Sequence, residues 1–327
     1  MSSEVLRIGS RGSRLALWQA EQAKDRLLAL NPGLLIEIQI IKTTGDVKPD
    51  PLSVIGGKGV FTKELEESLL DKRIDIAVHS LKDLPTIIPD GLSISAICER
   101  EDPRDALILP WDRGRLARTA AQDALKPAGG PPAVPGSLRE LPTGSVVGTS
   151  SQRRLAQLKA LRSDVTVKDL RGNVDTRVRK LDEGQYDALI LASAGLIRLG
   201  LRGRISASID TTEMLPAVGQ GAIAIETRAD DEIAVTATSK LNHRETALAC
   251  RAERAFLRGL GGGCQFPIAA HAVVEGELLN LEGLVAKPDG SAFIREQLSG
   301  KIDHPEDIGS ALAERLLERG AGALLNG

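Results

Sequence analysis

Residues that mark specialised sites are scarce in this sequence of 327 residues. Aromatic residues make up only 2% of it, which argues against stacking platforms for nucleic-acid bases. It holds three cysteines and four histidines, with no Cys-x-x-Cys pair and no histidine pair at metal-ligand spacing. A disulfide framework and a structural zinc site are therefore not expected, and we predict no bound metal.

An excess of charge and long apolar runs are missing as well. The formal net charge is −2, so the balance does not indicate a nucleic-acid or membrane partner. No apolar run approaches the length of a membrane span, and the first residues lack the basic and apolar stretches of a secretory signal. We expect a soluble protein in the reducing environment of the cytoplasm.

Two similar units follow one another along the chain, and its length predicts two or three domains. In the first unit we expect strands at 5–9, 35–41, 74–78 and 92–97, and helices at 15–30 and 61–70. In the second we expect strands at 145–148, 165–170 and 188–192, and helices at 151–161 and 174–181. Strands that alternate with helices predict two doubly wound α/β units with parallel sheets.

The remaining segments differ in composition. Residues 113–136 are rich in alanine, proline and glycine, which indicates a surface insertion with little capacity for a core. Residues 273–285 alternate around Glu275-Gly276 and predict a hairpin. A third strand at 292–298 and a helix at 308–319 would complete a small α+β domain.

Basic residues follow five of the predicted strands. Because ligands of open α/β sheets bind at the carboxyl ends of strands, we expect these side chains to meet in one cleft. They are Arg11, Lys82, Arg153, Arg154, Arg171, Arg177 and Arg198. Arginine suits bidentate recognition of carboxylate or phosphate, so the pattern predicts a polyanionic ligand. For any single one of them, the alternative is a solvated helix charge or a salt-bridge partner.

Asp83 stands beside Lys82 at one of these strand ends. Such a carboxylate is a candidate proton donor or cation stabiliser, and the alternative is an N-cap for the following turn. Residues 43–59 predict a long loop over the cleft, with a loop of no function as the alternative. Residues 56–59 lack the spacing of a phosphate-binding P-loop.

Cys264 lies in a glycine-rich loop after an amphipathic stretch at 245–260. Glycines let the backbone bend and let other groups approach closely, which favours a thiol that points outward. Free cysteines are also common in apolar cores, as we expect for Cys98 and Cys250. On this context alone, a reactive and an inert Cys264 both stay open.

Seven segments, ordered over nearly the whole chain, resemble the porphobilinogen deaminase family. They are GSRGSRLA (9–16), DIAVHSLKDLP (75–85), CEREDPRD (98–105), GTSSQRR (148–154), LRGNV (170–174), LPAVGQG (215–221) and GGCQ (262–265). The chain departs from the family in its longer proline-rich segment and at Gly12 and Arg14. For Arg14, a carboxylate contact and a solvated position are the alternatives.

The resemblance implies three domains, of which two are similar to periplasmic-binding-protein lobes around a cleft and the third is a small α+β domain. We expect the first domain at 1–101 and 221–240, the second at 102–220 and the third at 241–327. The resemblance also implies a monomer with a dipyrromethane cofactor, joined to Cys264 by a thioether. Four porphobilinogen units would condense head-to-tail on it with loss of ammonia, before hydrolysis frees the linear tetrapyrrole.

The same resemblance assigns roles residue by residue. Asp83 matches the catalytic carboxylate, which would stabilise the cation left when ammonia departs. At the cofactor we expect Ser80, Lys82, Asp83, Thr149, Ser151, Arg153, Arg154, Arg171, Gly172 and Cys264. At the carboxylates of the substrate and the growing chain we expect Arg11, Ser13, Arg171, Arg177, Arg198 and Gln220.

Two other functions fit parts of the sequence. A non-catalytic, two-lobed binder of acidic ligands would use the same cations, but it gives Cys264 no purpose, and no secretory signal is seen. An unrelated thiol enzyme would need a histidine partner for Cys264. His271 in a presumed strand and His243 before a helix are poor candidates for that partner.

Overall fold

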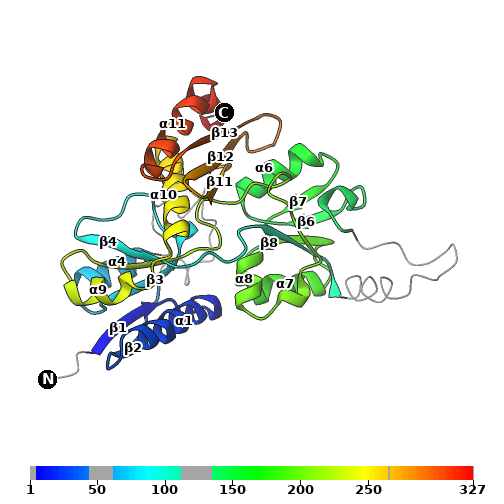
Figure 1. Ribbon diagram of the computed structural model, residues 1–327. Coiled ribbons are helices and arrows are strands. Elements are labelled where there is room, and N and C mark those ends of the chain that lie inside the picture. Colours follow the sequence, from blue (N-terminus) through cyan, green and yellow to red (C-terminus); the bar gives the residue numbers. More distant parts are fainter. Residues whose placement is uncertain (1–4, 44–61, 112–134, 264–265, 327) are drawn as a thin grey trace.

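The fold is that of a computed structural model, described for residues 5–43, 62–111, 135–263 and 266–326. These residues form three sheets, each with its own helices (Figure 1). The third sheet lies above the other two in this view, next to the C-terminus. Within these ranges, no helix is long and apolar enough to cross a membrane, and no three acidic, histidine or cysteine side chains are grouped to hold a metal ion.

The first sheet has five strands in the order β2-β1-β3-β10-β4. They are β1 (Val5–Ser10), β2 (Leu35–Ile40), β3 (Ile76–Ser80), β4 (Leu92–Ile97) and β10 (Ile223–Arg228). Its helices are α1 (Arg14–Leu30), α4 (Lys63–Leu70) and α9 (Glu232–Ser239). Leu27 of α1 packs with Ile8 in one core, and Leu65 of α4 packs with Ala77 in another. Helices therefore cover both faces of this sheet.

The second sheet also has five strands, in the order β7-β6-β8-β5-β9. They are β5 (Asp105–Ile108), β6 (Val146–Gly148), β7 (Thr166–Lys168), β8 (Ala188–Ala192) and β9 (Ala207–Ser208). The helices are α6 (Gln152–Leu161), α7 (Val174–Asp182) and α8 (Ser193–Arg198), with 3-10 turns η2 (Leu138–Glu140) and η3 (Arg202–Arg204). Leu158 of α6 packs with Val147, and Leu181 of α7 packs with Leu189 in a separate core.

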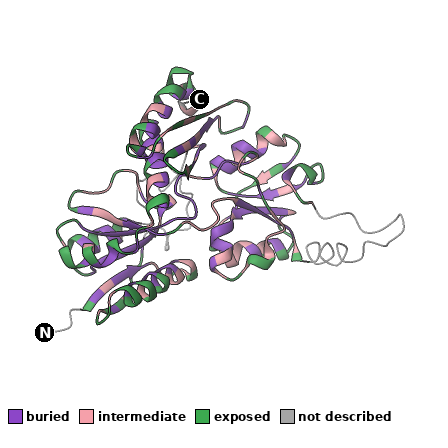
Figure 2. Ribbon diagram, in the orientation of Figure 1, coloured by how far each residue is buried: buried purple, intermediate pink, exposed green. Residues whose placement is uncertain are grey.

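The third sheet is an antiparallel meander in the order β11-β12-β13. Its elements are β11 (Ile268–Glu275), β12 (Leu278–Ala286), β13 (Phe293–Lys301), α10 (Arg244–Gly259), α11 (Pro305–Glu318) and α12 (Ala321–Asn326). Phe256 of α10 is fully buried in one core with Leu281 of the sheet and Leu312 of α11. Figure 2 shows buried strands in the interior of the first two sheets and helices that expose one side, whereas β13 is half-buried or exposed along its length.

The predicted fold class is confirmed, because the chain forms two doubly wound α/β units and a small α+β unit. The expectation of wholly parallel sheets was wrong. Strand β10 runs antiparallel to β3 and β4, and β5 runs antiparallel to β8. Both strands adjoin the segments that pass between the sheets, so neither follows a crossover helix. The apolar pattern missed β10 because Glu226 and Arg228 interrupt it, although both are buried.

Two segments join the first two sheets. Residues 98–104 lead from β4 to β5, and residues 209–222 lead back from β9 to β10. They touch each other, because the Glu101 N–H donates to the Gly221 carbonyl at 3.1 Å. Gly221 has a φ of +91°, and a Cβ there would lie 2.3 Å from the Glu101 carbonyl oxygen. A side chain does not fit at this crossing point.

We predict that Gly221→Ala destabilises the protein more than Gly184→Ala, its matched control. Both glycines have a positive φ, but a Cβ at Gly184 meets nothing within 4 Å. The control should therefore lose about 1–2 kcal/mol, the cost of a left-handed alanine. Gly221→Ala should lose more, because the Glu101 backbone has to move. Denaturant unfolding measures both losses, and equal losses would contradict a tight crossing.

Candidate functional site

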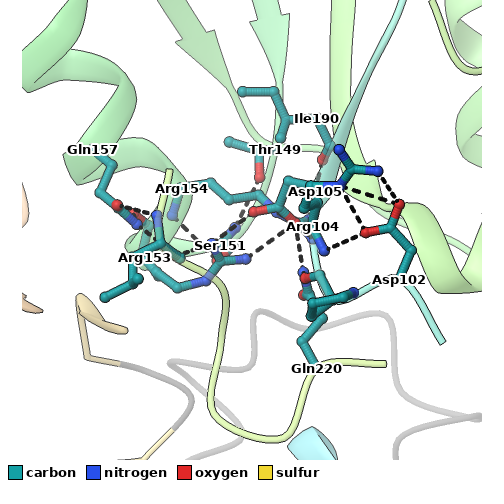
Figure 3. Close-up of polar contacts among 12 residues, drawn as sticks. Asp102, Arg104, Asp105, Thr149, Ser151, Arg153, Arg154, Gln157, Ile190 and Gln220 are labelled. Carbon is teal, nitrogen blue, oxygen red and sulfur yellow. Dashed lines mark hydrogen bonds and ion pairs between the residues drawn. The ribbon is translucent and has the colours of Figure 1, made fainter. Parts of the chain in front are cut away.

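A fully buried carboxylate, Asp105, organises one edge of the second sheet. It is the first residue of β5 and is 0% exposed. Its Oδ2 accepts a hydrogen bond from Arg153 Nη1 at 2.7 Å, and its Oδ1 accepts from Arg154 Nη2 at 2.8 Å and Gln220 Nε2 at 2.9 Å (Figure 3). Burial alone would raise the pKa of Asp105, but the charges of Arg153 and Arg154 hold it well below its usual range.

Arg153 and Arg154 reach Asp105 because both stand in the first turn of α6. Ser151 caps this helix, with its Oγ accepting from the Arg154 N–H at 3.4 Å. Thr149 Oγ1 in turn accepts from the Ser151 N–H at 3.2 Å. Four predicted site residues therefore lie together at the end of β6, and both guanidinium groups are buried and held in place.

The first sheet contributes Lys82 and Asp83, which lie in the 3-10 turn η1 (Leu81–Asp83) directly after β3. Lys82 is half-buried and Asp83 is exposed. Burial lowers the pKa of Lys82, the charge of Asp83 opposes that shift, and the charge of Arg154 adds to it. Because charge interactions weaken steeply with distance, this coupling means that the end of β3 faces the arginines of the second sheet.

Helix α7 brings Arg177 to the same place. Its Nε donates to the carbonyl of Gly172 at 2.7 Å, one turn earlier. Burial lowers the pKa of Arg177 to about 10, and the charge of Arg154 contributes to that shift. The charge of Asp83, from the first sheet, acts on Arg177 in the opposite direction. Arg177 therefore lies close to charged groups of both sheets.

Positive charge exceeds negative charge in this group, which we call the cationic site. Its cations are Lys82, Arg153, Arg154, Arg171 and Arg177, and the carboxylates that face them are Asp83, Asp105 and Asp169. Within the described ranges, the buried atoms Arg153 Nε and Gln220 Oε1 have no hydrogen-bond partner. A ligand with several carboxylates fits the site, because it would supply negative charge to the cations and an acceptor to Arg153 Nε; Gln220 Oε1 is itself an acceptor and needs a donor instead.

Arg11, Ser13 and Ser80 lie at the ends of β1 and β3, which are neighbours in the first sheet. Ser13 caps α1, with its Oγ accepting from the Ala16 N–H at 3.3 Å. Ser80 Oγ accepts from Gln19 Nε2 at 2.9 Å. The sheet topology therefore brings these predicted residues together on the first sheet, beside the turn that holds Lys82 and Asp83.

Arg198 lies at the crossing of the two segments that join the first two sheets. It is 8% exposed, stands over the Trp18 ring at 5.8 Å from its centroid, and donates Nη2 to the Gly221 carbonyl at 2.6 Å. Burial lowers its pKa, and the charge of Glu101 opposes that shift. Arg198 and Trp18 border a pocket of about 360 Å³ between α1 and residues 98–101. This predicted cation therefore lies where the two sheets are joined.

Several predictions fall on residues outside the described ranges. Cys264, the predicted attachment point, is one of them, and the segments 43–59 and 113–136 lie almost wholly outside as well. Cys98 and Cys250 are buried free thiols, as expected. Burial raises the pKa of Cys250 to about 12, which keeps this thiol protonated and unreactive at neutral pH.

Two buried carboxylates were not singled out by the sequence. Asp105 lies in segment 98–105, one of the seven that resemble the family. A carboxylate next to a short apolar run indicates that it is buried, and a buried carboxylate needs cationic partners. Glu253 of α10 is 0% exposed and accepts from Arg100 Nη1 at 2.6 Å and from the Gly219 N–H at 2.7 Å. Only one feature of the sequence could have indicated a buried Glu253, namely its position on the apolar side of an amphipathic helix.

We predict that Asp105→Asn costs about 3–5 kcal/mol of stability, because it leaves Arg153 and Arg154 buried without a counter-charge. The matched control, Asp164→Asn, removes an exposed bidentate pair with Arg162 and should cost far less. The pKa of Asp105 is lowered in the folded protein, so its ionised form stabilises the fold. The stability lost in Asp105→Asn should therefore be greatest above about pH 4 and should decrease as the pH falls further. Thermal unfolding from pH 7 to pH 3 tests this, and equal losses in the two variants would contradict it.

Several solved structures resemble this fold at low sequence identity. The B. pertussis BvgS periplasmic domain is 16% identical with a TM-score of 0.37, over 72% of this chain and 39% of that one. Lactococcus lactis GlnP substrate binding domain 2, in its open conformation, is 14% identical with a TM-score of 0.40, over 80% and 92%. The probable amino-acid ABC transporter extracellular-binding protein YtmK from Bacillus subtilis is 11% identical with a TM-score of 0.39, over 73% and 90%.

Two family models match the chain in sequence order. The model of the porphobilinogen deaminase dipyrromethane cofactor binding domain matches residues 6–236, which contain the cationic site. The model of the porphobilinogen deaminase C-terminal domain matches residues 247–318, which contain Cys264. The chain therefore belongs to the porphobilinogen deaminase family, whose members are transferases that bind a dipyrromethane cofactor.

Proposed function

We propose that this transferase is a hydroxymethylbilane synthase. It joins four porphobilinogen units head-to-tail with release of ammonia, and then hydrolyses the bound product to the linear tetrapyrrole hydroxymethylbilane. The observation that carries the proposal is the cationic site, with Asp83 exposed at its edge, in a chain of this family. Porphobilinogen carries an acetate and a propionate, so each addition brings two more carboxylates to a site with excess positive charge.

We assign the dipyrromethane cofactor to the cationic site, with a thioether to Cys264. The residues that would contact the cofactor are Ser80, Lys82, Asp83, Thr149, Ser151, Arg153, Arg154, Arg171 and Gly172, with the cations among them facing its carboxylates. The unpartnered Arg153 Nε supports this assignment, because it is a buried donor in need of an acceptor. When bound, the cofactor supplies the pyrrole carbon that attacks the first substrate unit. Arg153 and Arg154, held by Asp105, would fix its orientation.

We assign the carboxylates of the incoming substrate and of the growing chain to a second set of residues. These are Arg11, Ser13, Arg171, Arg177, Arg198 and Gln220. Arg177 supports the assignment because it lies close to Asp83, where a substrate unit would react. Arg198 borders a pocket at the junction of the sheets, so it would meet a different part of a lengthening chain from Arg177.

Asp83 is the residue we assign to catalysis. Its side chain is exposed at the turn after β3, beside Lys82 and near Arg177, so it is available to a bound substrate. Loss of ammonia leaves a cation on the substrate, and a fixed carboxylate stabilises that positive charge. The same carboxylate would accept hydrogen bonds from pyrrole N–H groups. It would also help to move the proton released when the new carbon–carbon bond forms.

We also propose that the chain has three domains, at 1–101 with 221–240, at 102–220 and at 241–327. The two connections between the first two sheets, at 98–104 and 209–222, support this division. The monomeric state and the cytoplasmic location stay predictions. A non-catalytic binder of acidic ligands is the alternative function, since it would use the same cationic site.

The intact mass of the purified protein separates these two functions. We expect it to exceed the sequence mass by one dipyrromethane, and we expect Cys264→Ser to abolish this increment, because the thioether needs the thiol. Cys98→Ser, at a buried thiol directly after β4 in the core of the first sheet, is the control and should keep the increment. If the wild-type protein carries no adduct, even after incubation with porphobilinogen, the synthase proposal fails and the non-catalytic binder remains as the function.

We predict that Asp83→Asn keeps the cofactor but slows turnover by about 10²- to 10⁴-fold, the range for loss of a group that handles protons and charge. Asp90→Asn, at another exposed aspartate a short distance along the chain, should turn over like the wild type. Steady-state formation of hydroxymethylbilane, together with the intact mass of each variant, measures both effects. Near-normal turnover in Asp83→Asn would defeat the catalytic assignment.

A further inference from the structure

An ion pair between two exposed side chains connects the first and second sheets. Arg14 is the first residue of α1 and Asp175 lies in the first turn of α7. Arg14 Nη1 and Asp175 Oδ1 are 2.9 Å apart, although the residues are 161 positions apart in sequence. The side chains remain 70% and 38% exposed, so water surrounds the pair. Arg14 is thus largely solvated, as one of its two alternatives expected, and it also contacts a carboxylate of another helix of the same chain.

Arg14 stands at the N-terminus of its helix, where a nearby anion is stabilising. The N-terminus of an α-helix carries partial positive charge, so an arginine there is disfavoured without a nearby anion. Helix α1 has no acidic residue in its first turn, whereas α7 has Asp175 in the corresponding place. The α1 terminus has its Ser13 cap but no anion of its own, and Asp175 provides one from another helix.

The pair stands where the two sheets approach each other. A Cβ on Gly195, at the start of α8, would lie 3.7 Å from Leu15 Cδ2 and 3.9 Å from Val174 Cγ2, which is ordinary contact distance. The beginnings of α1, α7 and α8 therefore converge here, as Figure 1 shows. Arg14 directly follows Ser13, and Asp175 stands in the same short helix as Arg177, so the pair lies at helix starts that also carry members of the proposed substrate set.

We propose that Arg14 is a further substrate-binding residue and that Asp175 competes with the substrate for it. In the absence of substrate, Arg14 pairs with Asp175; a carboxylate of porphobilinogen or of the growing chain then replaces Asp175 as its partner. An exposed ion pair is weak, so a ligand that brings two carboxylates to the same place displaces it at little cost. This inference rests on the proposed function, because it takes porphobilinogen as the substrate.

Single and double variants test the exchange through the KM for porphobilinogen. Arg14→Gln should raise KM about two- to five-fold, because the substrate loses a partner, while Asp175→Asn should lower it by a similar factor, because Arg14 is released. The double variant should match Arg14→Gln, since Asp175 acts only through Arg14. The turnover number should change little in all three, because the pair stands outside the groups assigned to bond formation.

The matched control is the exposed pair of Arg251 and Glu306 between α10 and α11, joined at 2.5 Å from Arg251 Nε and 51% and 37% exposed. Arg251→Gln and Glu306→Gln should leave KM unchanged. A merely structural link between the sheets predicts that both Arg14→Gln and Asp175→Asn shift KM in the same direction, and that result would overturn the inference. Absence of turnover in the wild-type protein would instead overturn the proposed function, so the two failures are distinguishable.

Discussion

The arrangement of the cationic site depends on one buried carboxylate. Asp105 carries a single negative charge, yet it binds two guanidinium groups and the amide of Gln220. Burying charges is costly unless they are paired, so neither arginine would stay in this position without Asp105. Because one carboxylate faces two arginines, the group keeps a net positive charge. The same contact therefore stabilises the second sheet and leaves it attractive to an anion.

This contact extends by hydrogen bonds to the third sheet. Arg100 Nε donates to the carbonyl of Gln220 at 2.8 Å, and Arg100 Nη1 donates to Glu253 Oε1 at 2.6 Å. The same Glu253 oxygen accepts from the Ala272 N–H of β11 at 2.8 Å. Every group in this series is buried or half-buried and has a defined partner. The helix that leads toward Cys264 is thereby placed relative to Asp105, although the two lie far apart in sequence.

The sequence predicted the fold class and most of the cationic site, because strand ends and motifs are local features. Lys82, Arg153, Arg154 and Arg177 were expected at strand ends, and the structure brings them together. Arg198 lies beside Trp18 and donates to the carbonyl of Gly221, the residue after the Gln220 that binds Asp105. Asp105, Glu253 and the partner of Arg14 depend on contacts between segments more than 40 residues apart, and no local pattern reveals such pairs.

The crossing at Gly221 has a mechanical consequence. The first two sheets are joined by two chain segments at one place, and those segments are hydrogen-bonded to each other through Glu101 and Gly221. Two adjacent connecting segments form a hinge between the sheets. The two sheets can bend relative to each other about a single axis, whereas twisting them would separate the two segments. If the proposed reaction lengthens a chain between the two sheets, they would separate along one path and not in every direction.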